Sequence, residues 1–207
     1  MFSQTSFRKL ALSLAMFAVV ALSSAVAAKA DQVVINTPNA GLSGTPGPYA
    51  TVTYVLNGSG GIDVSVQMAP GFTAFGDGNG NNGIFGFNVV GSTAGLNITG
   101  LPAGWSFSTT GGQMDGFGNF DVTLDCCNPA NAVSSFSFTI SRTGGFSSAS
   151  DIFEASSTGA HFAIHIAPTN GNPTGFAADA VPEPTTMLLL GTGLAALAGG
   201  LRKRFKT

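Results

Sequence analysis

The two cysteines of the chain are adjacent, so no disulfide can join distant segments of one chain. In an oxidising compartment, Cys126 and Cys127 can join to each other as a vicinal disulfide. A regular strand forbids this bond, because it points consecutive side chains to opposite faces. Asn128-Pro129 predicts a turn directly afterwards, which permits it. We expect either a vicinal disulfide or two thiols that are free or paired between chains, rather than a catalytic or metal-binding thiol.

A loop rich in Gly and Asn carries oxygen ligands at the spacing of a calcium site. Asp77, Asn79 and Asn81 match the first, third and fifth positions of an EF-hand loop. The match then fails, because Asn82 and Asn88 stand where that loop needs Gly and Glu. We therefore expect no cofactor and interpret the loop as a connection between strands, with calcium as the alternative. Calcium has a second possible set of ligands, the carboxylates of three neighbouring strand ends: Asp115, Asp121 and Asp125.

Residue types that carry enzymatic chemistry are sparse. His161 and His165 share one face of an expected strand about 13 Å apart, too far to chelate one metal, and we interpret that face as solvated. Glu154 is the only glutamate between residues 31 and 181, which makes a pair of catalytic carboxylates hard to nominate. We predict that the protein is not an enzyme. Three aromatic residues are candidates for stacking on a sugar, although Trp105 is interpreted as a core residue: Trp105, Tyr49 and Tyr54.

Charge is distributed unevenly along the chain. Residues 31–181 contain nine acidic residues and one basic residue, Arg142, which gives a net charge of −8. Nucleic-acid binding needs clustered cations that displace counterions, so this composition excludes nucleic acid as a partner. Neutral Ser, Thr, Asn and Gly provide most of the polar surface, a composition typical of exported proteins that work among glycans.

The central region predicts strands and turns in place of helices. Alternating apolar and polar residues recur in short segments, and Gly or Pro signals separate them about every ten residues. Thirteen Phe residues from Phe72 to Phe176 supply bulky side chains for a core. We predict an all-β fold, an antiparallel β-sandwich or jelly-roll-like domain. The expected strands are 33–36, 51–56, 62–68, 84–90, 96–99, 105–109, 119–124, 133–140 and 161–166.

Two segments at the borders of this domain read as irregular. Residues 37–48 are rich in Gly and Pro and predict a flexible lead-in. Residues 167–180 predict an exit linker toward the C-terminal tail. Phe176 within that linker is a candidate for packing against the domain.

The pattern of the N-terminal residues predicts a secretory signal peptide. Arg8 and Lys9 precede an apolar stretch over residues 10–22, and small residues follow it. Cleavage after Ala30 is expected to leave Asp31 as the new N-terminus, with cleavage after Ala27 as the alternative. We therefore expect the Sec export machinery and signal peptidase as partners.

The C-terminal 27 residues combine three features in order. Pro182-Glu183-Pro184 keeps the chain extended, because each proline fixes φ and restricts its predecessor. Residues 185–201 carry no charge and predict a helix of about 25 Å, close to the thickness of a bilayer core. Basic residues then follow, and they are expected to hold the C-terminus in the cytoplasm: Arg202, Lys203, Arg204 and Lys206.

This tail resembles the PEP-CTERM sorting signal of exported bacterial proteins. The resemblance implies recognition by an exosortase, a membrane cysteine transpeptidase, with cleavage near residues 182–184. Exported proteins with this tail often carry a run similar to Gly171-Asn-Pro-Thr-Gly-Phe176 before it. The expected organisation is a signal peptide at 1–30, a β domain at 31–180 and a sorting signal at 181–207.

These features favour a non-enzymatic surface or extracellular-matrix protein associated with exopolysaccharide or biofilm. The precursor is expected in the inner membrane, and the processed protein at the cell surface or in the matrix. A carbohydrate-binding or calcium-assisted adhesive module is the alternative function.

Overall fold

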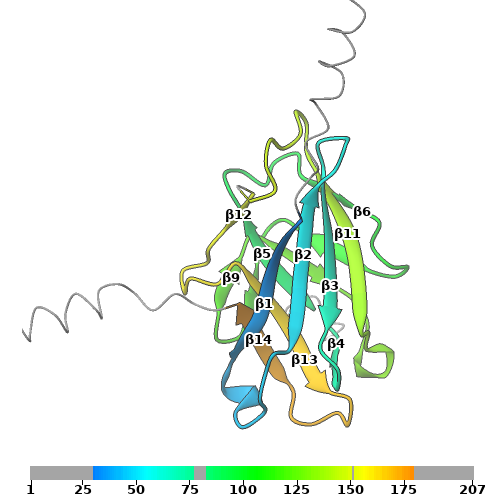
Figure 1. Cartoon of the computed structure of the whole chain (residues 1–207), viewed down its shortest axis with the longest axis vertical. Coiled ribbons are helices and arrows are strands. Elements are labelled where there is room, and N and C mark those ends of the chain that lie inside the picture. The colour runs from blue at the N-terminus through cyan, green and yellow to red at the C-terminus, as the bar shows by residue number, and fades with distance from the viewer. Residues whose placement is uncertain (1–29, 77–82, 151, 180–207) are drawn as a thin grey trace, which may run out of the picture.

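The computed structural model describes residues 30–76, 83–150 and 152–179, and in these the regular structure is strands with two short 3-10 helices (Figure 1). The helices are η1 (Ala40–Leu42) and η2 (Pro129–Asn131). The strands are β1 (Asp31–Pro38), β2 (Ala50–Leu56), β3 (Ile62–Met68), β4 (Phe72–Ala74), β5 (Phe85–Val89), β6 (Asn97–Thr99), β7 (Ser106–Ser108), β8 (Gly112–Met114), β9 (Gly118–Phe120), β10 (Val122–Asp125), β11 (Ser135–Ser141), β12 (Phe153–Glu154), β13 (Phe162–Pro168) and β14 (Gly175–Asp179).

Twelve of these strands form one antiparallel sheet, in the order β6-β11-β3-β2-β1-β14-β13-β5-β10-β7, with β12 added beside β5 and β4 beside β13. Strands β8 and β9 form a separate hairpin. The all-β antiparallel class predicted from the sequence is confirmed. The last strand, β14, is internal to the sheet, because β1 and β13 pair with its two sides.

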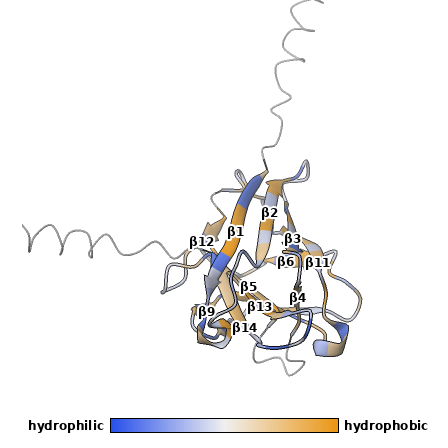
Figure 2. Cartoon of the chain, turned by 60° about the horizontal axis from the view of Figure 1, so that its bottom comes forward, coloured by the Kyte–Doolittle hydropathy of each residue, from blue (hydrophilic) through white to orange (hydrophobic). Residues whose placement is uncertain are grey.

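Alternation along the strands decides which residues face the core. In β3, Ile62, Val64 and Val66 are buried and their neighbours are exposed, as period-two side-chain geometry requires. In Figure 2, β2 shows orange bands separated by paler ones, whereas β1 has one orange stretch between two blue ones. Tight turns preserve this register: Asn57 and Gly61 close the turn between β2 and β3 through a backbone hydrogen bond of 2.8 Å.

The main core forms where the two halves of the sheet face each other. Phe85 of β5 lies 5.7 Å from Phe136 and 6.1 Å from Phe138 of β11, measured between ring centroids. These strands are far apart in the order of the sheet, so the sheet folds back on itself around them. Aromatic rings at these separations gain packing energy beyond their buried area, which explains the Phe-rich composition.

A second core cluster lies on the other side of β13 and β14. Met114, Phe117 and Phe120, from the β8–β9 hairpin, cluster there with the strand residues Ala163 and Ala178. The hairpin needs close contact with the sheet, and Gly86 allows it: a Cβ on Gly86 would lie 2.8 Å from the Met114 Cε.

Each expected strand overlaps an observed one, and the differences lie in short or atypical segments. The expected strand 119–124 is two strands, β9 and β10, separated at Asp121. None of the expected strands covers β4, β8, β12 or β14. The lead-in interpretation is wrong for its start and for Leu42, since β1 extends to Pro38 and Leu42 is fully buried. The exit-linker interpretation is wrong for residues 175–179, which form β14.

Candidate functional site at the end of the last strand

Strand β14 is the last described element before the C-terminal tail, and it lies between β1 and β13 inside the sheet. All five of its residues are buried. One of its faces contributes Ala177 to the main core, and the other contributes Phe176 and Ala178 to the second core. A strand buried on both faces and paired on both edges can leave the fold only if the sheet opens.

The carboxylate of Asp179 secures the end of β14. Its Oδ1 accepts backbone hydrogen bonds from His161 at 2.8 Å and from Phe162 at 2.9 Å. Its Oδ2 accepts a bond from the His161 Nδ1 at 2.9 Å. The Asp179 side chain is 7% exposed and the His161 side chain 40%, so the carboxylate lies inside and the imidazole covers it. Hydrogen bonds to a charged acceptor are stronger than neutral ones.

Asn39 secures the start of the same strand. Its backbone N–H donates to the Phe176 carbonyl at 2.8 Å, and its Oδ1 accepts from the Phe176 N–H at 3.1 Å. Its Nδ2 donates to the Asp115 carboxylate at 3.1 Å, which connects the strand to the β8–β9 hairpin. Gly175 makes room for this amide, because a Cβ there would lie 2.6 Å from the Asn39 Oδ1.

The start of β1 and the end of β14 lie at the same end of the sheet. Strand β1 runs antiparallel to β14, with Ile35 opposite Asp179, so Asp31 lies four residues beyond the end of β14, about 13 Å along the strand. Tyr54 stands opposite Asp31 on β2. Burial raises the pKa of Tyr54, and the negative charges of Asp31 and Asp179 raise this pKa further.

The His161–Asp179 pair has the chemistry of a base and its orienting acid, as in serine hydrolases. Among the residues that the structure describes, no hydroxyl or thiol forms a hydrogen bond with His161 that would complete such a group. Two backbone N–H groups already use the Asp179 carboxylate. The pair therefore acts as a clamp on the chain end.

His165 departs from the solvated face predicted for both histidines. Its ring stacks on Phe176 with centroids 4.4 Å apart and lies 4.3 Å from the ring of Phe75. The prediction was wrong because it considered one strand in isolation, whereas the loop before residue 77 and β14 cover this face.

Cys126 and Cys127 are joined as a vicinal disulfide in the structure. They follow β10 and precede η2, outside any regular strand, which is the local condition that this bond needs. The Cys127 carbonyl accepts a hydrogen bond from the Gly76 N–H at 3.0 Å. The pair therefore lies beside Gly76.

The first calcium-ligand set, Asp77, Asn79 and Asn81, lies outside the described residues. The second is not assembled: within 30–76, 83–150 and 152–179, no three His, Cys, Asp or Glu side chains gather in a group that could hold a metal. Asp115 and Asp121 instead make separate hydrogen bonds to different parts of the fold. Asp115 binds Asn39, and the Asp121 Oδ2 accepts from the Val89 N–H at 3.4 Å.

The three candidate sugar-stacking aromatics do not form one platform. Tyr49 is fully buried, and its hydroxyl donates to the Thr45 carbonyl. Trp105 packs on Phe136 at the border of the main core, with ring centroids 4.9 Å apart. Its interpretation as a core residue agrees with this contact.

Sequence reasoning missed the clamp on β14. Asp179 and Asn39 are single polar residues in segments that read as linkers, and nothing in their local pattern marks a strand. One signal was available: Gly175-Phe176, the end of the run seen before similar tails, is a residue with no side chain followed by a large apolar one. The structure uses the first to admit Asn39 and the second to fill the second core.

The residues expected to direct sorting lie beyond the described part: Pro182, Glu183, Pro184, Arg202, Lys203, Arg204 and Lys206. The expected membrane helix 185–201 lies there too. A search of the described residues for a helix long and apolar enough to cross a membrane found none.

In the comparison with known families, the PEP-CTERM protein-sorting motif matches residues 180–204. The resemblance inferred for the tail is thereby confirmed, and the matched segment begins one residue after β14 ends. No curated protein and no solved structure matches the chain.

Proposed function

We propose that this protein is a non-enzymatic component of the bacterial surface or extracellular matrix, delivered there by processing of its C-terminal tail. Export by the Sec machinery and removal of residues 1–30 by signal peptidase come first. An exosortase-type enzyme then reads Pro182-Glu183-Pro184 and cuts near it. The processed domain works in association with extracellular polysaccharide.

The observation that carries this proposal is the position of the sorting motif relative to the fold. The motif match begins at residue 180, directly after the strand that Asp179 clamps. A cut near residues 182–184 therefore removes no described strand and opens no part of either core. A cut inside β14 would expose both cores, whereas a cut near residues 182–184 would leave β14 in the sheet.

The end of the domain also suits a membrane-held precursor. Four cations after residue 201 favour a cytoplasmic C-terminus and a domain outside the membrane. Asp31 and Asp179 lie on the same side of the sheet. The expected signal peptide and the expected sorting helix can therefore be inserted in the same membrane at the same time. The domain then need not reorient between the two cleavage steps.

Replacing Glu183 by Ala tests the proposal. If the enzyme reads the carboxylate, cells will accumulate a larger precursor in the membrane fraction, and the released form will fall at least tenfold. Glu154→Ala is the matched control, since Glu154 is an exposed glutamate of the folded domain, and its processing should equal wild type. Equal processing of the Glu183 variant and wild type would remove recognition at this residue from the proposal.

A further inference from the structure

The two halves of the sheet differ in what covers their outer faces. The β8–β9 hairpin covers β13 and β14. In the described part of the chain, nothing comparable covers the outer face of β2, β3 and β11, whose side chains are intermediate or exposed. Most of these side chains are short, neutral and polar. In register across the strands they form rows, one of which is Ser137, Ser65, Thr53 and Gln32.

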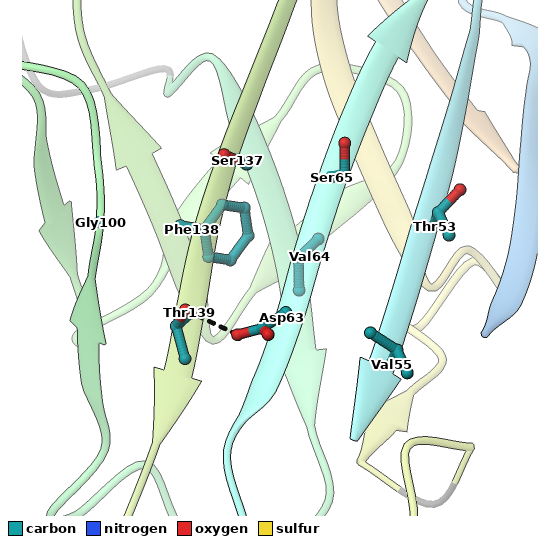
Figure 3. A pocket seen from close by; sticks show the side chains of 9 residues that line it. All are labelled: Thr53, Val55, Asp63, Val64, Ser65, Gly100, Ser137, Phe138 and Thr139. Carbon is teal, nitrogen blue, oxygen red and sulfur yellow. Dashed lines mark hydrogen bonds between the residues drawn. The ribbon is translucent and has the colours of Figure 1, made fainter. Parts of the chain in front are cut away.

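A shallow depression lies on this face. It has a volume of about 310 Å³ and is bordered on one side by Gly100 (Figure 3). Hydroxyl groups of Thr53, Ser65 and Ser137 line it, from three adjacent strands. Neighbouring strands lie about 4.8 Å apart, so the hydroxyls repeat across the sheet at that interval.

One carboxylate stands among these hydroxyls. The Asp63 Oδ1 accepts a hydrogen bond from the Thr139 hydroxyl at 2.8 Å (Figure 3). The same oxygen accepts a bond from the Asn57 amide at 2.9 Å, so the two donors orient the carboxylate while Asp63 remains exposed. An oriented carboxylate accepts strong, charge-assisted bonds from neutral hydroxyl donors.

We propose that this depression binds a neutral polysaccharide chain. The proposal deepens the association with extracellular polysaccharide proposed above and assigns it to a place on the sheet. Sugar hydroxyls donate to Asp63 and exchange hydrogen bonds with Thr53, Ser65 and Ser137. A polymer contacts several of the repeated hydroxyls at once, which compensates for weak individual contacts.

Charge decides against an anionic polymer. Residues 31–181 carry nine acids and one base, and the single carboxylate of the depression would face the polymer's own charges. Polyanion recognition requires clustered cations. A metal-bridged ligand is also disfavoured, because Asp63 belongs to no group of three metal-binding side chains in the described part of the chain.

A protein partner fits less well. Stable protein interfaces are built around aromatic or other large apolar anchors. Val55 is the one apolar residue of this lining that lies on the outward side of its strand, since Val64 and Phe138 are buried in the core. The depression therefore offers hydrogen-bonding groups but no outward aromatic or large apolar side chain that could serve as an anchor.

Affinity electrophoresis of the full chain in mild detergent tests this proposal. The probes are hydroxyethyl cellulose and dextran, both neutral, with polygalacturonate as the anionic comparison. We expect retardation by at least one neutral polymer and none by polygalacturonate. Thr53→Val and Asp63→Asn keep the shape of the side chain and should each weaken retardation at least threefold, and the double variant at least tenfold. Thr143→Val, at an exposed threonine outside the depression, should behave as wild type.

Ser65→Leu separates a binding defect from a folding defect. Ser65 faces solvent, so leucine fills the depression without entering the core, and the variant should keep the wild-type melting temperature and lose retardation. The proposal is overturned if neither neutral polymer is retarding, if the variants bind as wild type, or if polygalacturonate binds better. Processing of the tail is scored in the same strains: normal processing with absent binding refutes this site alone, and failed processing of wild type refutes the proposed function.

Discussion

At the scale of residues, two polar side chains hold the strand from which the sorting tail emerges. Asp179 closes the end of β14, and Asn39 closes its start. Both side chains satisfy backbone N–H groups that would otherwise be buried without acceptors. Leaving such a group unsatisfied costs about 1–3 kcal/mol. These residues therefore stabilise the fold in two ways: they form hydrogen bonds, and they prevent backbone N–H groups from being buried without an acceptor.

Replacing Asp179 by Ala is expected to lower the free energy of unfolding by about 2–4 kcal/mol, because two backbone N–H groups and the His161 ring lose their acceptor. Asp179→Asn keeps one acceptor oxygen and should cost less. Urea denaturation measures both, and hydrogen exchange of the β14 amides should accelerate in the same order. Glu154→Gln, which removes an exposed charge, is the control. A wild-type midpoint for Asp179→Ala would contradict the clamp.

The raised pKa of Tyr54 predicts how the free energy of unfolding changes at alkaline pH. Its pKa is raised in the folded state above the ordinary value of 10.0, so the unfolded phenol loses its proton at a lower pH. The stabilisation is present below pH 10 and is lost as pH rises through the folded pKa. Tyr54→Phe cannot ionise, and its stability should fall less steeply above pH 10. Equal slopes for variant and wild type in urea unfolding would contradict this prediction; Tyr49, whose pKa burial also raises, leaves a residual slope in both.

At the scale of elements, the sequence predicted the strands that alternate clearly and missed those defined by their neighbours. Strand β11 was predictable because Phe136, Phe138 and Ile140 alternate with small polar residues. Strand β14 shows no alternation of buried and exposed residues. All five of its residues are buried, since a hairpin and the main core cover its two faces. A strand of this kind becomes visible only when the elements that cover it are known.

The same limit applies to the candidate sites. Adjacent cysteines left two outcomes open, and the structure contains the disulfide, which is possible because the two residues lie outside any strand, between β10 and η2. The depression on β2, β3 and β11 depends on register between strands that are up to 80 residues apart. No local pattern encodes that register, although the hydroxyl-rich alternation of each strand was visible separately.

Gly175 connects the residue scale to the element scale, and its replacement by Ala is a test of the β14 start. The new Cβ would lie 2.6 Å from the Asn39 Oδ1 and displace the amide that holds Phe176. We expect a loss of about 1–3 kcal/mol, typical of overpacking. Gly58→Ala is the matched control, since a Cβ there meets nothing within 4 Å. Thermal unfolding of the two variants should separate them, and similar melting temperatures would argue against close packing at Gly175.

At the scale of the whole molecule, the described fold ends directly before the matched sorting motif. One folded sheet encloses the main core, the β8–β9 hairpin covers the second, and the first and last strands, β1 and β14, are neighbours. The chain enters and leaves on the same side of that sheet. Removal of both flanking segments therefore leaves the described sheet intact, and a net charge of −8 in residues 31–181 favours solubility of the product.

The intact mass of the exported, surface-released protein tests the central claim most directly. The proposed processing predicts a chain that begins at Asp31, or at Ala28 after the alternative cleavage, and ends within residues 182–184 with β14 retained. Any group transferred to the new C-terminus would add a discrete mass to that value. Released protein that still ends at Thr207, or that ends before Asp179, would contradict processing at the boundary between fold and sorting motif.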